Sequence, residues 1–176
     1  MKTFVILFLL CFNSITILGQ QTVVTEIDDN GKLAGQSVIE FEDKSAEDIY
    51  NKAEEWIAFT FMNTESVTQS KVENKMLRLK GISKSALGPF MGFEFDLSYQ
   101  IQLDIKEGKL RFTANELNQV SQAPPYTKTS LELLFKKGKL KQKKGFIKMK
   151  SQIDETLTQI QESLISQITG KGKDDW

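Results

Sequence analysis

The stretch from Phe93 to Leu117, FEFDLSYQIQLDIKEGKLRFTANEL, decides the fold. Large apolar residues occupy every second position up to Ile105, and the alternation resumes at Leu110 beyond a short loop that contains Gly108. Successive side chains of a strand point to opposite faces, so the pattern predicts a long β-hairpin with one apolar and one polar face. The loop also sets the register, and the expected cross-strand pairs are Ile105–Leu110, Leu103–Phe112 and Ile101–Ala114.

Two segments are predicted to be helices that cover the apolar face. Ser45 is a favourable N-cap with acidic residues after it, and apolar residues follow at helical spacing to about Phe61. The same spacing recurs over residues 146–169, and Gly170 ends the pattern. A sheet face as long as the one predicted for the hairpin can be covered by these two helices together.

The composition and the order of elements define the expected fold class. With 176 residues, of which 40% are hydrophobic and 26% are charged, the chain is expected to form one globular domain with its own core. Further strands are expected over residues 37–41 and in a second hairpin over residues 67–82, which gives the order β-α-β-β-β-β-α. This order predicts an α+β fold, with an antiparallel sheet of about five strands and both helices packed on one face.

Residues 1–20 have the pattern of a secretory signal peptide, in which a basic residue precedes an apolar run. The run is shorter than the roughly 20 residues that a membrane-spanning helix needs. We therefore expect export to the periplasm or the exterior, with cleavage near Gly19 or Gln20. Lipidation of Cys11, the only cysteine, is disfavoured because Leu10 is not small. The expected organisation is a signal peptide over residues 1–20, a leader over 21–36, a single domain over 37–170 and a tail over 171–176.

The residues needed for common catalytic chemistry are missing from the expected mature chain. The sequence has no histidine, and its one cysteine lies in the signal segment. The usual general base, thiolate nucleophile and zinc ligands are therefore absent, and no glycine-rich phosphate loop occurs. We expect no enzymatic activity, no catalytic residues, no cofactor and no bound metal.

Two surfaces are candidate binding sites. One is the polar face of the long hairpin, for which the sequence offers no cover. The other is a lysine-rich segment between residues 136 and 150, which either is a solvated loop and helix start or contacts an anionic surface. The formal net charge of zero and the lack of an aromatic platform among the lysines argue against nucleic acid. The candidate residues are Glu94, Asp96, Gln100, Gln102, Asp104, Arg111, Lys139, Lys141, Lys143 and Lys144.

Three segments resemble a known family: SAEDIY at residues 45–50 with Ala53 and Trp56, LRLKG at 77–81, and YQIQLDIKEGKLR at 99–111. Around them, residues 38–120 are similar to the exported bacterial domain-of-unknown-function family 4468, described as having a TBP-like fold. The resemblance implies a curved antiparallel sheet with helices on one face, and an exported Gram-negative protein of the Bacteroidetes type. It implies no functional residue, because the TBP name describes shape alone.

Two functions are consistent with the sequence. The first is a non-enzymatic exported binding domain of the cell envelope, which would contact a protein, a glycan or the envelope surface and would include peripheral contact with an anionic membrane. The second is a carrier of a hydrophobic small molecule or lipid in a cavity between the sheet and the C-terminal helix. The size of any internal cavity distinguishes the two functions, because an apolar pocket of about 300 Å³ or more would favour the carrier.

Overall fold

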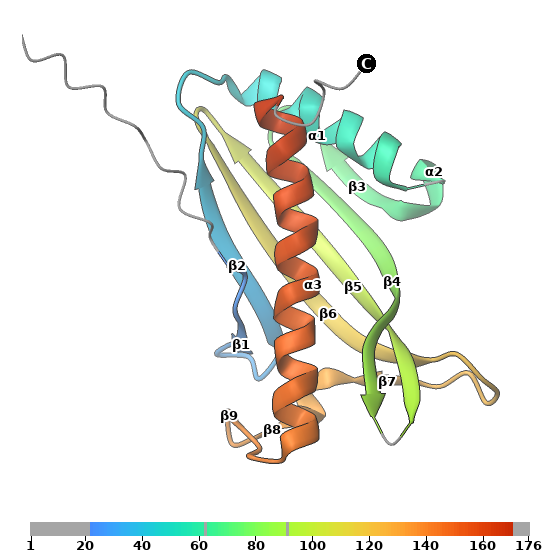
Figure 1. Cartoon of the computed structure of the whole chain (residues 1–176). Coiled ribbons are helices and arrows are strands. Elements are labelled where there is room, and N and C mark those ends of the chain that lie inside the picture. Colours follow the sequence, from blue (N-terminus) through green and yellow to red (C-terminus); the bar gives the residue numbers. More distant parts are fainter. Residues whose placement is uncertain (1–21, 62, 91, 171–176) are drawn as a thin grey trace, which may run out of the picture.

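The computed structural model describes residues 22–61, 63–90 and 92–170. The expected order β-α-β-β-β-β-α is confirmed, as β2, α1, β3, β4, β5, β6 and α3 (Figure 1). The predicted signal peptide and tail lie outside the described residues. No helix in the described ranges is long and apolar enough to cross a membrane. The elements are β1 (Thr25–Ile27), β2 (Leu33–Glu40), α1 (Ala46–Thr60), α2 (Thr64–Val67), β3 (Thr68–Val72), β4 (Met76–Phe90), β5 (Phe93–Lys106), β6 (Lys109–Ser121), β7 (Lys128–Ser130), the 3-10 turn η1 (Leu131–Leu134), β8 (Phe135–Lys136), β9 (Lys139–Leu140) and α3 (Lys144–Thr169).

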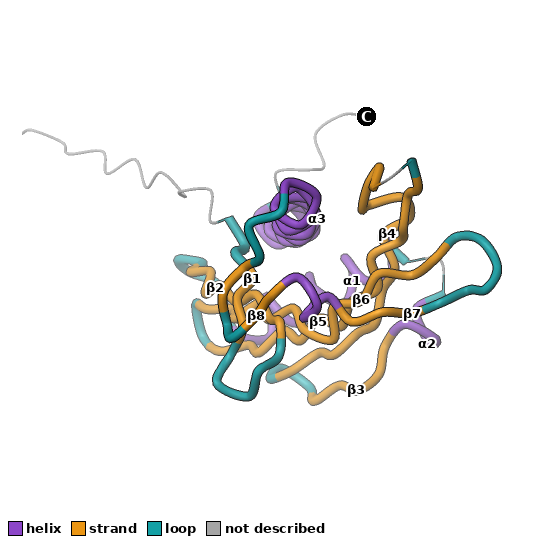
Figure 2. The backbone as a smooth tube through the Cα atoms, turned by 90° about the horizontal axis from the view of Figure 1, so that it is seen from below, coloured by secondary structure: helices purple, strands orange, loops and turns teal. Residues whose placement is uncertain are grey.

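One antiparallel sheet forms the body of the domain. Its strands lie in the order β1-β2-β6-β5-β4-β3, and β7 pairs with β6. The helix α3 crosses one face of this sheet and packs against α1 (Figures 1 and 2). The α+β fold with both helices on one face is therefore confirmed. The sheet has seven strands rather than about five, because the short β1 and β7 extend it, and β8 and β9 form a separate two-stranded sheet.

The long hairpin of β5 and β6 has the predicted register. Its tip is anchored to the connection between β2 and α1 by two backbone hydrogen bonds. The Phe41 N–H donates to the Gly108 carbonyl at 2.8 Å, and the Gly108 N–H donates to the Lys44 carbonyl at 2.9 Å. Gly108 has a φ of +65°, as its place in a tight loop requires. The confirmed pairs, all of them buried, are Ile105–Leu110, Leu103–Phe112 and Ile101–Ala114.

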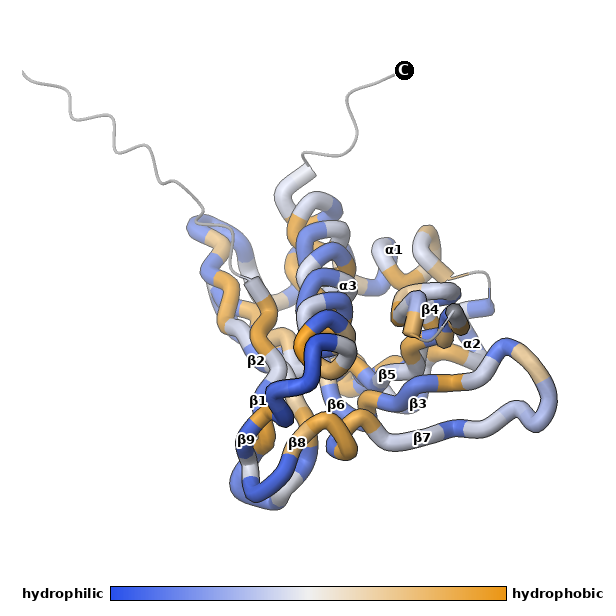
Figure 3. Tube along the Cα trace, turned by 60° about the horizontal axis from the view of Figure 1, so that its bottom comes forward, coloured by the Kyte–Doolittle hydropathy of each residue, from blue (hydrophilic) through white to orange (hydrophobic). Residues whose placement is uncertain are grey.

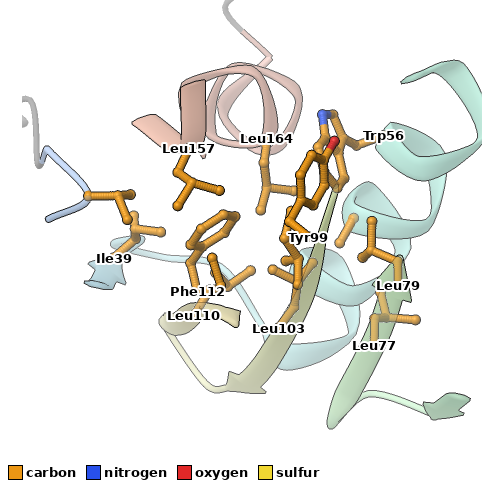
Figure 4. Close-up of a cluster of buried hydrophobic side chains, with 14 of the residues drawn as sticks. Ile39, Trp56, Leu77, Leu79, Tyr99, Leu103, Leu110, Phe112, Leu157 and Leu164 are labelled. Carbon is orange, nitrogen blue, oxygen red and sulfur yellow. The ribbon is translucent and has the colours of Figure 1, made fainter. Parts of the chain in front are cut away.

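The helix α3 covers the apolar face of the hairpin. Its inward stripe, which includes Ile153, Leu157 and Leu164, is fully buried and meets the aromatic ring of Phe112 from the sheet (Figure 4). Each such side chain contributes about 1.5–3 kcal/mol through burial. Gln161 interrupts the stripe and accepts a hydrogen bond from the Ser37 hydroxyl of β2. Apolar and polar residues alternate along the helix and strands as this packing requires (Figure 3).

The helix α1 begins at the predicted N-cap. The Ser45 hydroxyl accepts a hydrogen bond from the Asp48 N–H at 3.0 Å, and the Asp48 carboxylate accepts one from the Ser45 N–H at 3.3 Å, which makes a capping box. The Ser45 hydroxyl also donates to the Asp48 carboxylate at 2.7 Å, and this bond, together with the one from the Ser45 N–H, holds the pKa of Asp48 below its ordinary value. Near the other end of α1, the Trp56 Nε1 donates to the Ser163 hydroxyl of α3 at 3.1 Å. The two helices are thus joined over the sheet.

The prediction of a leader over residues 21–36 is wrong, because β1 and the first residues of β2 lie in this range and belong to the sheet. Thr25 in β1 pairs with Gly35 in β2, and Val23 is fully buried. Position 35 needs glycine because an added Cβ would lie 2.8 Å from Val23 Cγ1. Asp154 of α3 fixes β1 by accepting hydrogen bonds from the Thr25 N–H at 3.0 Å and hydroxyl at 2.7 Å. A strand of three residues leaves too short an alternation to recognise in sequence.

Strand β4 continues through Gly88 and Pro89 to Phe90. The Gly88 N–H donates to Gln152 Oε1 at 3.0 Å, and the Gln152 side-chain amide donates back to the Gly88 carbonyl. This amide of α3 takes the place of a neighbouring strand. Pro89, which lacks an N–H, is tolerated because it lies on the edge of the sheet.

Candidate functional site

The sheet face opposite α3 carries an ordered set of polar side chains, which we call the polar network. Its members come from the beginning of β4, the second half of β5 and the first seven residues of β6. Strand alternation places them there, because neighbouring residues such as Leu103 and Phe112 point into the core. The long helix α3 crosses the opposite face of the sheet and packs against α1 there (Figures 1 and 2). The polar network consists of Arg78, Gln100, Gln102, Asp104, Arg111 and Asn115.

Hydrogen bonds within the polar network run across three strands. Arg78 donates to Gln102 Oε1 from Nη2 at 2.6 Å and from Nε at 3.1 Å. Gln102 Nε2 donates to Asp104 Oδ1 at 2.8 Å. Arg111 donates to Asp104 Oδ2 from Nη2 at 2.8 Å and from Nε at 3.0 Å. These contacts fix the side chains before any partner arrives, which lowers the entropy cost of binding.

The structure brings together only part of the predicted polar site. Gln100, Gln102, Asp104 and Arg111 all belong to the polar network. Gln100 joins it at one side, where its Nε2 donates to Asn115 Oδ1 at 3.0 Å. The two remaining residues of the hairpin lie apart from the network. Glu94 is exposed near the beginning of β5, and Asp96 is buried.

Asp96 is a structural residue rather than an accessible binding group. The register between β4 and β5 shifts beside it, and its carboxylate accepts hydrogen bonds from Lys84 Nζ at 2.8 Å, the Ser85 N–H at 3.0 Å and Gln122 Nε2 at 2.7 Å. Burial raises the pKa of Asp96, but the hydrogen bonds from Lys84, Ser85 and Gln122 lower the pKa by more. The carboxylate is therefore held ionised at the end of the sheet, where it fixes the bulge of β4.

The predicted lysines do not join the polar network. They lie in β9, in the loop after it and at the beginning of α3, at one end of the domain (Figure 1). Lys141 Nζ donates to the Leu133 carbonyl at 2.6 Å, and the Lys141 and Lys143 ammonium groups lie 5.5 and 5.7 Å from the centre of the Phe146 ring. Among the described residues, no lysine from 136 to 148 forms an ion pair with an acidic side chain. The basic end, as we call it, consists of Lys136, Lys137, Lys139, Lys141, Lys143, Lys144 and Lys148.

A groove of about 340 Å³ runs between β4, α3 and the C-terminal end of α1. The rings of Trp56 and Phe61 meet edge to face with their centres 5.7 Å apart, and the Tyr99 ring extends from the sheet toward the helices (Figure 4). Gly81 makes room for Tyr99, because an added Cβ would lie 2.4 Å from the ring. Burial raises the pKa of Tyr99. The groove is also lined by Ser83, Lys84, Thr156, Gln159, Ile160 and Ser163.

The described residues offer three surfaces for binding and no evident metal centre. In the described ranges, no group of three histidine, cysteine, aspartate or glutamate side chains is placed to hold a metal ion. Every buried side-chain nitrogen and oxygen there has a hydrogen-bond partner. The surfaces considered for a partner are the polar network, the basic end and the groove.

Sequence and structure comparisons agree on the fold. Residues 36–119 match the family described as "Domain of unknown function (DUF4468) with TBP-like fold". A crystal structure of a DUF4468 family protein from Bacteroides ovatus ATCC 8483 superposes with a TM-score of 0.67 at 15% identity, over 81% of this chain and 90% of that one. A TBP-like protein from Parabacteroides distasonis ATCC 8503 gives a TM-score of 0.59 at 13% identity, over 85% and 97%. No curated protein matches the chain in sequence.

Proposed function

We propose that the chain, whose residues 36–119 match the DUF4468 family of TBP-like domains, is an exported, non-enzymatic binding domain of the cell envelope. It contacts a partner protein through the polar network. One observation carries the proposal: the polar network is ordered by its own hydrogen bonds on a sheet face that the described helices leave uncovered. Side chains held in this way are a preformed surface.

The charges around the polar network favour a protein partner over a polyanion. Arg111 pairs with Asp104, and two further ion pairs flank the network, Lys80 with Glu116 at 3.1 Å and Lys109 with Glu40 at 2.9 Å. The face therefore has little net field to attract phosphates. Exposed apolar side chains also lie on this face, as expected for a surface that contacts protein; these are Val38 and Ile82.

The chemistry of the chain supports a non-enzymatic role. A general acid or base needs a pKa near the working pH, and the pKa of the buried Asp96 is shifted in the opposite direction. The chain has no histidine to take that part. Export is supported by the signal-peptide pattern of residues 1–20.

A photo-reactive amino acid at Thr113 tests the proposal in the intact cell. Thr113 of β6 pairs with Gln102 of β5, so its side chain lies on the same face, beside the polar network. The matched control carries the same group at Glu47, which is exposed on α1. We expect a discrete protein adduct from position 113 and none from position 47. Adducts from both positions, or from neither, would contradict the proposal.

The basic end supports a second contact, with an anionic membrane surface. Its lysines have no acidic partner among the described residues, and Ile147 beside them is 44% exposed. The first turn of α3 contains no acidic residue, so the positive end of the helix dipole adds to the lysine charge. A cluster of lysines next to an exposed apolar residue is typical of peripheral binding to anionic lipid.

Carrying a hydrophobic small molecule is the alternative function. The space beneath α3 is filled, because Ile153, Leu157 and Leu164 are fully buried. The groove beside β4 is the volume that such a molecule would occupy, and its size falls within the usual range for ligand sites. Native mass spectrometry of the chain purified from its own envelope tests this. A retained lipid would establish the carrier, and a ligand-free mass would contradict it.

A further inference from the structure

The outer edge of β4 is unpaired over the middle of its length. β3 pairs only with the beginning of β4, and at the other end the Gln152 amide binds Gly88. Between these points, no strand of the described residues pairs with the edge. The Ile105 N–H donates to the Lys75 carbonyl at 2.8 Å. The backbone carbonyl of Lys75 therefore points toward β5. In an antiparallel pair the backbone groups of successive residues point alternately toward and away from the partner strand, so the N–H and C=O of Ile82, seven residues further along, point away from β5.

This free edge forms one wall of the groove. The Gln152 amide that binds Gly88 belongs to α3, so the edge faces the helix. Ser83 and Ala86 line the groove from β4, and Ile160 lines it from α3. An extended chain placed between the two elements would meet backbone groups on one side and side chains on the other.

We propose that an extended segment of another protein binds here by adding a strand to β4. Its backbone pairs with the N–H and C=O of Ile82, and its large apolar side chains enter the groove at alternate positions against Trp56, Phe61, Tyr99 and Ile160. Strand addition of this kind takes affinity from the main chain and specificity from pockets for alternate side chains. The site lies on the helix-covered side of the sheet, so it is independent of the polar network.

The chemistry of the groove distinguishes such a segment from a second copy of this chain. If β4 of a second copy paired at this edge, Gly81 and Ser83 would face the groove and leave it unfilled. The groove therefore requires larger apolar side chains than β4 itself supplies. Lys84 is the only charged residue among the described residues that line the groove, and it already pairs with Asp96 at 2.8 Å, so the segment that enters the groove is neutral.

A phage-displayed library of random peptides, selected on residues 22–176, supplies the probe. We expect the enriched peptides to alternate apolar and polar residues, and synthetic copies to protect the Ile82 N–H from hydrogen exchange. Ile82→Pro removes that N–H, which β4 does not use to pair with β5, and should weaken binding about tenfold. The matched control, Ile82→Thr, should bind as the wild type does.

A second variant tests the groove without touching the strand. Gln159 is exposed on α3 and lines the groove, so Gln159→Trp should fill it and weaken peptide binding about tenfold or more. Ser151→Trp, on an exposed part of α3 outside the groove, is the control and should bind normally. Absence of enriched peptides, or equal binding by all variants, would overturn the proposal. It would also be overturned by a dimer that Ile82→Pro dissociates, because the edge would then belong to a second copy.

Discussion

The polar network and the basic end both carry cations, but they arrange them differently. In the polar network each guanidinium has an acceptor within hydrogen-bond distance, as Arg111 has in Asp104 at 2.8 Å. At the basic end, Lys139, Lys143 and Lys144 are exposed and form no ion pair with any described acidic residue. The basic end therefore acts through its electrostatic field, and the polar network acts through the fixed geometry of its hydrogen bonds. Unpaired charge acts at a distance and without orientation, whereas paired charge is recognised only by a surface that fits it.

This difference predicts that salt weakens binding at the basic end much more than binding at the polar network. The field of unpaired lysines decays over about 8–10 Å at physiological ionic strength and over less at higher salt. Contacts to the polar network depend on short hydrogen bonds, which ionic strength affects much less.

The largest effect is expected for membrane binding by the basic end. Replacing Lys139, Lys143 and Lys144 with glutamine should weaken binding to phosphatidylglycerol-containing vesicles by about 100-fold, since each lysine near an anionic surface contributes about 1 kcal/mol. Vesicle sedimentation measures this. Lys141 is left unchanged because it donates to the Leu133 carbonyl.

A second triple variant is the matched control for that measurement. Lys80, Lys106 and Lys109 are exposed sheet residues, and two of them already have acidic partners. Changing these three to glutamine removes the same formal charge, and vesicle binding should change little. Equal losses from both triple variants would show that total charge, and not the basic end, determines binding.

An intermediate effect is expected for stability when the buried charge of Asp96 is removed. Asp96→Asn loses a charge-assisted hydrogen bond from Lys84, and we expect a loss of about 2 kcal/mol at neutral pH. The pKa of Asp96 is lower in the folded state than in the unfolded chain. Its contribution is therefore complete above the unfolded pKa of about 4 and disappears as pH falls through the folded pKa.

Urea unfolding of the wild type and Asp96→Asn across acidic pH checks this. The free energies of unfolding of the two proteins should converge as pH falls below about 4. A constant difference at every pH would mean that the carboxylate is not held ionised by its neighbours.

The smallest effect is expected for the pair between Asp104 and Arg111. The Arg111 side chain is 51% exposed, so a double-mutant cycle with alanine at both positions should give a coupling energy of about 0.2–1 kcal/mol. Binding of the partner to the polar network should be lost in either single variant, although the fold is hardly destabilised. A coupling well above 1 kcal/mol would show that the network serves stability rather than recognition.

The sequence predicts the frame of the fold but not its edges. The alternation from Phe93 to Ile105 and the helical stripe of α3 are long, and each repeats its period many times. β1 has only three residues, so its pairing with β2 depends on Gly35 and on Asp154 far along the chain. The continuation of β4 past Gly88 likewise depends on Gln152 of α3. Such contacts are not local and leave no periodic signal.

The candidate site, like the fold, is only partly predictable from the sequence. Alternation correctly assigns Gln102, Asp104 and Arg111 to the uncovered face. Alternation also assigns Asp96 to the uncovered face as an accessible residue. Asp96 is buried instead, because the register between β4 and β5 shifts beside it. The groove combines residues of α1, β4, β5 and α3, which are far apart in the sequence, so no local pattern indicates it.

Photo-crosslinking at two positions in one envelope preparation tests whether the polar network is the protein-binding surface. The same photo-reactive group is placed at Thr113 beside the polar network and at Lys137 in the basic end, and adducts are compared between about 0.05 and 0.5 M salt. We predict a protein adduct from position 113 that persists at high salt, and at position 137 only lipid adducts, which high salt abolishes. Loss of the position 113 adduct at high salt, or a protein adduct only from position 137, would show that the polar network is not the protein-binding surface.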